Sequence, residues 1–148
     1  MPNEIEIRPM KFDDIDAVYG LELKLFASPW PRVFFENDLN LLATIAFVST
    51  AQNKVIGYVL GSCVSDELHV QNIAVAEEWQ RKGLAMQLMN GLEHEALSRN
   101  CRHFYLEVRP NNRSAIRLYE KLGYAVLYTR YHYYLDGDDA YVMTKELK

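Results

Sequence analysis

The chain has 148 residues, of which 49% are apolar and 24% charged, with a formal net charge of −4. This balance predicts a single globular domain over residues 1–148, and a mildly acidic chain lacks the basic face of nucleic-acid-binding proteins, so we expect no direct nucleic-acid binding. No apolar stretch is long enough to cross a bilayer and the start does not resemble a signal peptide, so we expect a cytoplasmic protein without a membrane partner.

The N-terminal part of the chain predicts a strand and two helices. Residues 4–8 alternate in polarity and Pro9 closes them, as in a short strand. Asp13 or Asp14 can cap a first helix, and Pro31 suits the first turn of a second one. Their apolar residues recur at helical spacing, at Ile15, Val18, Leu21 and Leu25 in the first helix and at Val33, Phe34 and Leu39 in the second.

The link between these helices, residues 27–31, places Trp30 between two prolines. A tryptophan in such a setting usually packs into a corner of the fold. It can equally serve as a lid over a substrate groove. The sequence leaves both interpretations open.

The middle of the chain predicts a β-hairpin. Residues 45–49 and 55–64 are apolar and flank the polar turn Gln52-Asn53. Gly57 and Gly61 weaken the second arm as an ordinary strand, so they indicate close approach of another backbone.

The remaining residues predict alternating strands and helices. These elements are a strand over 68–75, a helix over 83–97, a strand over 104–109, a helix from Asn111-Asn112 to Leu122, and strands over 124–134 and 140–147. Gly123 is placed to end the last helix in a left-handed cap, and Asp136-Gly137 is a strong turn signal. The order β-α-α-β-β-β-α-β-α-β-β predicts a mixed sheet with helices on its faces.

The segment Gln80-Arg81-Lys82-Gly83-Leu84-Ala85 has the features of an anion site. It follows an apolar strand and opens a helix, whose first backbone N–H groups have no internal partners. Gly83 and Ala85 keep side-chain bulk away, while Arg81 and Lys82 add cationic donors. The segment therefore predicts a cradle for a diphosphate.

A metal site is not expected. The pair His94-Glu95 lacks the second histidine of a zinc-protease motif, because Ser98 stands in that position. Cys63 and Cys101 are expected to be reduced packing residues, although the count of two allows a disulfide.

Three segments resemble the GCN5-related N-acetyltransferases (GNAT). Gln80 to Ala85 matches the Q/R-x-x-G-x-G/A signature of that family. Leu106-Glu107-Val108-Arg109, with the residues that follow to Tyr124, is similar to the LEVR-x-x-N-x-x-A-x-x-LY-x-x-LG-[FY] hallmark of RimI-type ribosomal-protein-alanine N-acetyltransferases and their archaeal relatives. Tyr133 to Met143 is similar to the YY-x-DG-x-DA-x-x-M ending of the same subgroup.

The resemblance implies an α/β (α+β) GNAT fold, with a mixed, mostly antiparallel sheet of about seven strands and about four flanking helices. It also implies acetyl-CoA as co-substrate, with Glu107 as general base and Tyr119 as general acid. The residues it assigns to acetyl-CoA are Ile73, Ala74, Val75, Arg81, Lys82, Gly83, Leu84, Ala85 and Asn112. Ala85 and Tyr124 replace a commoner glycine and phenylalanine, within the family pattern.

The acceptor is the less determined half of the reaction. A peptide α-amino group has a pKa of about 7.7–8.0 and a lysine amine about 10.4, so an N-terminal amine is more easily presented uncharged. The resemblance implies the N-terminus of a small-subunit ribosomal protein that begins with alanine. Candidate substrate contacts are Trp30, Glu67, Tyr133 and Tyr134.

Several alternatives stay open at this point. They are a broad archaeal-type protein N-terminal acetyltransferase, a small-amine or polyamine N-acetyltransferase, and a non-catalytic acetyl-CoA-binding regulatory module. An acidic strip at the acceptor mouth favours a polyamine, whereas an open aromatic groove favours a peptide. We expect a monomer or a weak homodimer.

Overall fold

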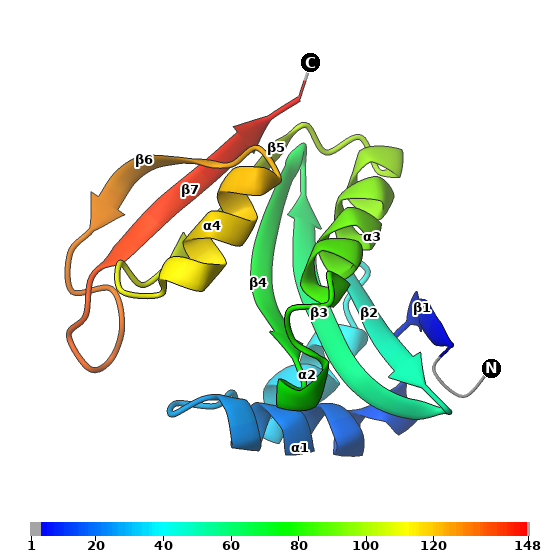
Figure 1. The fold of residues 1–148 in the computed structure, drawn as a ribbon. Coiled ribbons are helices and arrows are strands. Elements are labelled where there is room, and N and C mark those ends of the chain that lie inside the picture. Colours follow the sequence, from blue (N-terminus) through cyan, green and yellow to red (C-terminus); the bar gives the residue numbers. More distant parts are fainter. Residues whose placement is uncertain (1–3, 148) are drawn as a thin grey trace.

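The computed structural model describes residues 4–147 (Figure 1). Its first elements are β1 (Ile5–Pro9), the 3-10 turn η1 (Phe12–Asp14), α1 (Ile15–Leu25), α2 (Arg32–Leu39), β2 (Thr44–Ala51), β3 (Lys54–Val64) and β4 (Glu67–Val75). They are followed by the 3-10 turn η2 (Glu77–Trp79), α3 (Leu84–Ser98), β5 (His103–Val108), α4 (Arg113–Lys121), β6 (Ala125–Arg130) and β7 (Ala140–Glu146). This order of strands and α-helices is the predicted one.

The seven strands form one sheet in the order β1-β2-β3-β4-β5-β7-β6. All neighbouring strands are antiparallel except β4 and β5, which run parallel and are connected through α3. A parallel pair needs such a crossover, since a tight turn can join only antiparallel strands. The sheet therefore confirms the expected mixed, mostly antiparallel arrangement with four flanking helices in the described part of the chain.

Helices cover both faces of the sheet, as the alternation along β3 shows. Val59 belongs to a core with α3 and α4, whereas its neighbours Tyr58 and Leu60 belong to a second core with α1 and α2. Successive strand residues point to opposite faces, so the two cores lie on opposite sides of one sheet. In Figure 1, α3 and α4 lie on the near side of the sheet.

The sheet opens between its two parallel strands. β4 pairs with β5 only through Glu67, His69 and the residue between them, which face His103 to Tyr105. On its other edge β4 pairs with β3 along its whole length. The later part of β4, residues 70–75, therefore has a β5-facing backbone edge that pairs with no other strand among the described residues.

Glycines allow close packing in β3, as predicted. A Cβ added to Gly57 would lie 3.0 Å from the carbonyl oxygen of Ala74 and 3.3 Å from Leu88 of α3. The same atom on Gly61 would lie 3.1 Å from the carbonyl oxygen of His69. Both β4 and α3 thus approach β3 too closely for a side chain at these positions.

The predicted face of α2 is wrong. Val33 and Phe34 are 47% and 49% exposed, whereas Phe35 is fully buried against Tyr58. Three successive apolar residues spread over more than half of a helical turn, so the pattern alone could not select the residue that faces the sheet. Leu39 packs against the core, as expected.

The predicted strand over 124–134 is too long, because β6 ends at Arg130. His132 has a φ of 55°, outside the extended region, and the Tyr134 N–H donates to the Asp138 carbonyl. Residues 131–139 are called the β6–β7 loop below. Its predicted turn at Asp136-Gly137 is confirmed by the positive φ of 90° at Gly137.

Two helix ends were also predicted. Asp14 precedes α1, but its carboxylate accepts from Arg8 at 2.8 and 2.9 Å and from the Lys11 N–H at 2.7 Å rather than capping the helix. The left-handed end of α4 is confirmed, since Gly123 has a φ of 101°.

Both cysteines are free thiols, with Cys101 buried and Cys63 half-buried. Within residues 4–147, the helices are too short or too polar to cross a membrane.

Candidate functional site

The open edge of β4 forms one wall of the candidate site. The strand residues assigned to acetyl-CoA lie where the β5-facing edge of β4 is unpaired; they are Ile73, Ala74 and Val75. Their other edge pairs with Val59, Tyr58 and Gly57 of β3. Ala74 and Val75 are buried, so what this segment offers to a ligand is the backbone. An extended molecule with amide groups can pair with such an edge as another strand would.

The predicted diphosphate cradle follows directly. The Gln80 side chain donates from Nε2 to the carbonyl of Val75 at 2.9 Å and closes the loop on the end of β4. Arg81 and Gly83 have positive φ values of 64° and 83°, and Gly83 precedes α3 as its N-cap. Arg81, Lys82 and Gly83 are all exposed, so the first N–H groups of α3 face an open approach.

The remaining cradle residues have different roles. Lys82 lies over the ring of Trp79, with Nζ 5.6 Å from its centroid. Leu84 is buried in the core and Ala85 is half-buried, so they supply helix backbone and little side chain to the cradle. Asn112 caps α4 by accepting from the Ala115 N–H at 3.3 Å. Its amide nitrogen is a donor that the cap does not use.

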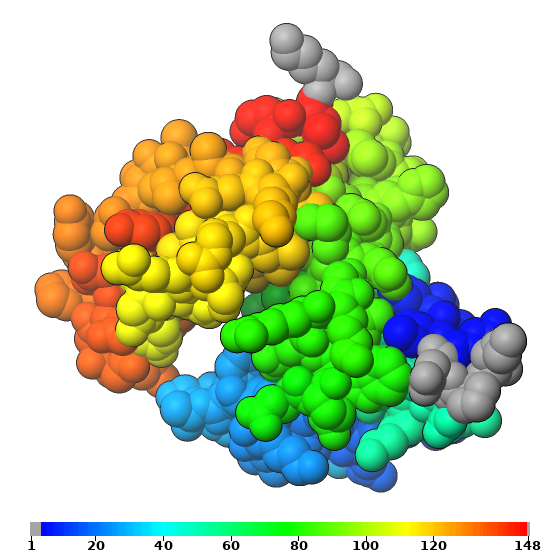
Figure 2. Space-filling view, viewed as in Figure 1, coloured from blue at the N-terminus to red at the C-terminus, as the bar shows by residue number. Residues whose placement is uncertain are grey.

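Figure 2 shows that the near face is hollowed beside this cradle. The hollow is bordered by the green residues that precede and open α3, by the yellow residues of α4, and by the light-blue link between α1 and α2. The loop at the start of α3 and the loop at the start of α4 therefore face each other across the opening.

Glu107 lies on β5 and contacts a histidine that the sequence analysis did not single out. Its side chain is 9% exposed, and Oε1 lies 2.6 Å from Nε2 of His69 on β4. The His69 ring stacks on Tyr105, with centroids 4.6 Å apart and an interplanar angle of 4°. The stacked pair fixes the ring plane, so His69 holds one oxygen of the Glu107 carboxylate in a defined direction.

The face shared by Glu107 and His69 follows from register. Glu67 and His69 of β4 face His103 and Tyr105 of β5. Alternate residues of a strand share a face, so Glu107 continues the same row. Glu67 lies at the exposed start of β4, at the far end of that row from the cradle.

Tyr119 is buried on the inner face of α4. Burial raises the pKa of its phenol to about 12, and the nearby Tyr134 adds to the effect. Tyr119 packs edge-on against Tyr124, with centroids 6.0 Å apart, and the Tyr124 hydroxyl donates to buried Glu93 at 2.7 Å. The phenol of Tyr119 is therefore protonated throughout the physiological pH range and available as a donor.

The backbone of Trp30 is held by the buried carboxylate of Glu22. Its backbone N–H donates to Oε2 of Glu22 at 2.9 Å. Oε1 of Glu22 accepts from the Tyr58 hydroxyl at 2.6 Å and from Nδ2 of Asn72 at 2.9 Å. Trp30 also packs edge-on and tilted against Phe34 and Phe35. Glu22 thereby ties the α1–α2 link to β3 and to the strand of the open edge.

Glu22 carried a signal that the sequence analysis did not use. It follows Ile15 and Val18 at helical spacing, so it falls on the buried face of α1. A charged residue on an apolar face is costly unless it is hydrogen-bonded, and three donors around Glu22 meet that requirement.

Tyr133 and Tyr134 lie in the β6–β7 loop, in T-shaped contact with centroids 5.0 Å apart. Burial raises the pKa of Tyr133, and the negative charge of Glu107 contributes. The Tyr133 phenol thus lies close enough to the Glu107 carboxylate to be affected by its charge. In residues 4–147 there is no cluster of three or more His, Cys, Asp or Glu side chains of the kind that holds a metal ion.

Comparison with known proteins identifies this arrangement. The family model described as "Acetyltransferase (GNAT) family" matches residues 15–124. The chain belongs to the GNAT family of acetyltransferases. The match confirms the family predicted from the three motifs, and it spans most of the described structure.

Individual relatives of this GNAT chain cover nearly its whole length. It is 33% identical to an "N-alpha-acetyltransferase" of Saccharolobus solfataricus, over 97% of this chain and 94% of the relative. It is 34% identical to the "[Ribosomal protein bS18]-alanine N-acetyltransferase" of Escherichia coli, over 93% and 94%. The crystal structure of the Escherichia coli ribosomal-protein-S18-alanine N-acetyltransferase superposes with a TM-score of 0.90 and 32% identity, over 98% of this chain and 95% of that one.

The protein is therefore an N-acetyltransferase that uses acetyl-CoA. The described residues fit this co-substrate. The unpaired edge of β4 offers hydrogen-bonding backbone to its amide-containing arm, and the exposed glycine loop offers free N–H groups to its diphosphate.

Proposed function

We propose that this GNAT enzyme is an N-alpha-acetyltransferase that transfers the acetyl group of acetyl-CoA directly to the N-terminal amine of a protein. The observation that carries the proposal is the contact between Glu107 and His69 at 2.6 Å. His69 is the last residue of β4 that pairs with β5, so the contact lies where the open edge of β4 begins. A carboxylate there suits an amine of pKa about 7.7–8.0, which needs to lose one proton before it can attack.

Glu107 is proposed as the general base. Its carboxylate removes one proton of the α-ammonium, directly or through a water, while His69 holds one of its oxygens. The free amine then attacks the thioester carbonyl, and backbone N–H groups of residues 72–75 are available to stabilise the oxyanion. The attacking nitrogen loses its second proton to water as the intermediate collapses to the amide. No covalent enzyme intermediate is needed, so Cys63 and Cys101 have no role in the transfer.

Tyr119 is proposed as the general acid. Collapse of the tetrahedral intermediate breaks the carbon–sulfur bond and leaves a thiolate. A phenol with a pKa of about 12 stays protonated at neutral pH and can donate to that sulfur. The assignments of Ile73 to Val75, Arg81 to Ala85 and Asn112 to acetyl-CoA are part of the same proposal.

The acceptor that we propose is a small-subunit ribosomal protein with an N-terminal alanine, which would place the enzyme in the cytoplasm. The likeness to the bS18-alanine N-acetyltransferase of Escherichia coli supports this choice, and Trp30, Glu67, Tyr133 and Tyr134 are the proposed acceptor contacts. The archaeal relative named only as an N-alpha-acetyltransferase supports the broader alternative, a protein N-terminal acetyltransferase with many substrates.

Replacing Glu107 tests the proposed mechanism. Glu107→Gln should lower kcat with an N-terminal peptide by about 10²–10⁴-fold, and raising the pH should restore part of the loss because the free amine then forms without a base. The KM of acetyl-CoA should change little. Glu95→Gln is the matched control, because Glu95 is a half-buried glutamate of α3 that is also paired with a side chain, that of Arg99. Unchanged kcat in Glu107→Gln at every pH would remove Glu107 as the base.

A peptide panel tests the acceptor. Among peptides that differ at their first two residues, alanine-initiated ribosomal sequences should be acetylated fastest, and an N-terminally blocked lysine peptide and spermidine should not be acetylated. Faster acetylation of spermidine or of the blocked peptide would contradict the proposal. Equal rates for many N-termini would favour the broad alternative. Acetyl-CoA binding without turnover of any amine would indicate a regulatory module.

A further inference from the structure

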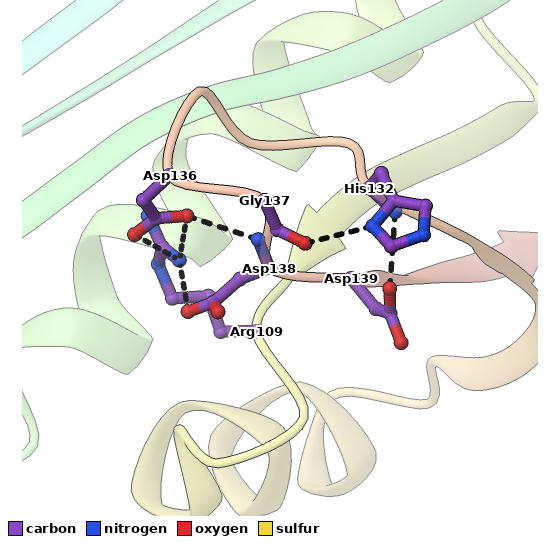
Figure 3. Close-up of polar contacts among 6 residues, drawn as sticks. All are labelled: Arg109, His132, Asp136, Gly137, Asp138 and Asp139. Carbon is purple, nitrogen blue, oxygen red and sulfur yellow. Dashed lines mark hydrogen bonds and ion pairs between the residues drawn. The ribbon is translucent and has the colours of Figure 1, made fainter.

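Arg109, two residues beyond Glu107, attaches the β6–β7 loop to the end of β5. Nη1 of Arg109 donates to Oδ2 of Asp138 at 2.6 Å and to Oδ1 of Asp136 at 3.1 Å. Figure 3 shows both carboxylates directed at the end of the Arg109 side chain, which reaches the loop from the end of β5.

The same guanidinium also covers a tyrosine of the loop. Its Cζ lies 4.0 Å from the centroid of the Tyr134 ring. A planar guanidinium can stack on an aromatic face and donate to carboxylates at its edge at the same time, whereas the ammonium of a lysine cannot stack flat. Arg109 therefore fixes the orientation of Tyr134 as well as the position of the loop.

The loop is braced internally, so a single attachment can position all of it. The Asp138 N–H donates to Oδ1 of Asp136 at 3.0 Å, and the Gly137 N–H donates to the Tyr134 carbonyl at 2.9 Å. His132 donates from its backbone N–H to Asp139 at 3.0 Å (Figure 3). The Asp138 N–H and the Arg109 guanidinium hold the pKa of Asp136 below its usual range, so the carboxylate is charged at neutral pH.

The position of the loop determines what surrounds the reacting amine. Tyr133 and Tyr134 lie in T-shaped contact, and Arg130 lies over the Tyr133 ring with Cζ 4.8 Å from the centroid. Both tyrosines lie near Glu107, whose negative charge helps to raise their pKa values. A shift of the loop would move both phenols away from the carboxylate without affecting the cradle at the start of α3.

We propose that Arg109 is a positioning residue that sets the acceptor side of the site by fixing the β6–β7 loop against β5. This inference rests on the proposed function, because it assigns the loop to peptide binding. It predicts that Arg109 controls the affinity for the peptide and leaves the affinity for acetyl-CoA unchanged.

The experiment compares Arg109→Ala and Arg109→Lys with wild type and with Arg102→Lys, an exposed arginine at the other end of β5. Arg109→Ala should raise the KM of an N-terminal peptide about tenfold, with the KM of acetyl-CoA within about twofold of wild type. Arg109→Lys keeps the charge but not the stacking, so its peptide KM should lie between those of wild type and Arg109→Ala. Arg102→Lys should match wild type in both constants.

The two carboxylates supply a second test. The double variant Asp136→Asn/Asp138→Asn should raise the peptide KM like Arg109→Ala, and combining the three changes should add little, because they remove one attachment. An equal rise in both Michaelis constants, or an unchanged peptide KM in Arg109→Ala, would overturn the inference, even if the melting temperature falls.

Hydrogen exchange separates this inference from the proposed function. Amides of residues 131–139 should exchange about tenfold faster in Arg109→Ala than in wild type, whether or not a peptide is turned over. If wild type acetylates no peptide, the proposed function fails while the attachment of the loop is still measured. Unchanged exchange in the loop would overturn the attachment itself.

Discussion

The two sides of the site are built in different ways. The proposed donor side consists of β4 residues 73–75 and the cradle 80–85, and it offers mainly backbone: an unpaired strand edge, a left-handed glycine and the start of α3. The proposed acceptor side consists of Trp30, the Glu107–His69 pair and the β6–β7 loop, and it depends on side chains. Its decisive contacts join residues 29, 38 and 50 positions apart in the chain.

A site made of backbone can be recognised in a sequence, whereas a site made of side chains can be adjusted by single substitutions. A backbone site requires only that a short segment adopt a given conformation, so a few residue types at fixed spacing reveal it. A side-chain site requires several distant segments to meet in register, so its specificity can change through single contacts. The following predictions act on the link between the two sides, on each side separately, and on a pair outside both.

The largest effect is expected where the two sides are joined. Glu22→Leu leaves the N–H of Trp30, the hydroxyl of Tyr58 and the amide of Asn72 without their buried acceptor, which should cost about 3–5 kcal/mol of unfolding free energy. Urea unfolding measures the loss. Glu22→Gln keeps one acceptor oxygen and should lose less. A loss under about 1 kcal/mol in Glu22→Leu would show that the network does not hold the two sides together.

Substitutions at two glycines test the donor side and the acceptor side separately. Gly83 in the cradle and Gly137 in the β6–β7 loop have φ values of 83° and 90°, and no atom of the described structure lies within 4 Å of an added Cβ at either position. Alanine at each should therefore cost about 1–2 kcal/mol through backbone strain alone. Steady-state kinetics should show a raised KM for acetyl-CoA in Gly83→Ala and a raised peptide KM in Gly137→Ala. If both variants changed the KM of acetyl-CoA and the KM of the peptide in the same way, the division into a donor and an acceptor side would be contradicted.

The smallest effect is expected at a pair outside both sides. The Arg8 guanidinium holds the pKa of Asp14 below its usual range, so the pair stabilises the protein at pH values above the unfolded pKa of about 3.9 and stops doing so as the pH falls through the lower folded value. Asp14→Asn should lower the unfolding free energy by about 1 kcal/mol at pH 7, and the difference should disappear in acid. Both Michaelis constants should stay at wild-type values. A kinetic change in this variant would mean that the Michaelis constants respond to general destabilisation and not to which side of the site is altered.

Local patterns predicted most elements because each depends on neighbours a few residues away. The hairpin turn at Gln52-Asn53 and the left-handed Gly123 were both predicted in this way. The face of α2 was not, since Val33 and Phe34 fit a helix as well as Phe35 does. Only packing against Tyr58 selects Phe35.

The candidate site divides along the same line. The order of the elements and the family follow from the sequence alone and are confirmed. The proposed donor cradle is also predicted from the sequence, because a glycine loop at a helix start is specified within one short segment. Three contacts, in contrast, could be found only in the folded chain: His69 with Glu107, Glu22 with Trp30 and Asn72, and Arg109 with the β6–β7 loop. Those contacts depend on strand register and helix rotation, and these are set when the whole core packs.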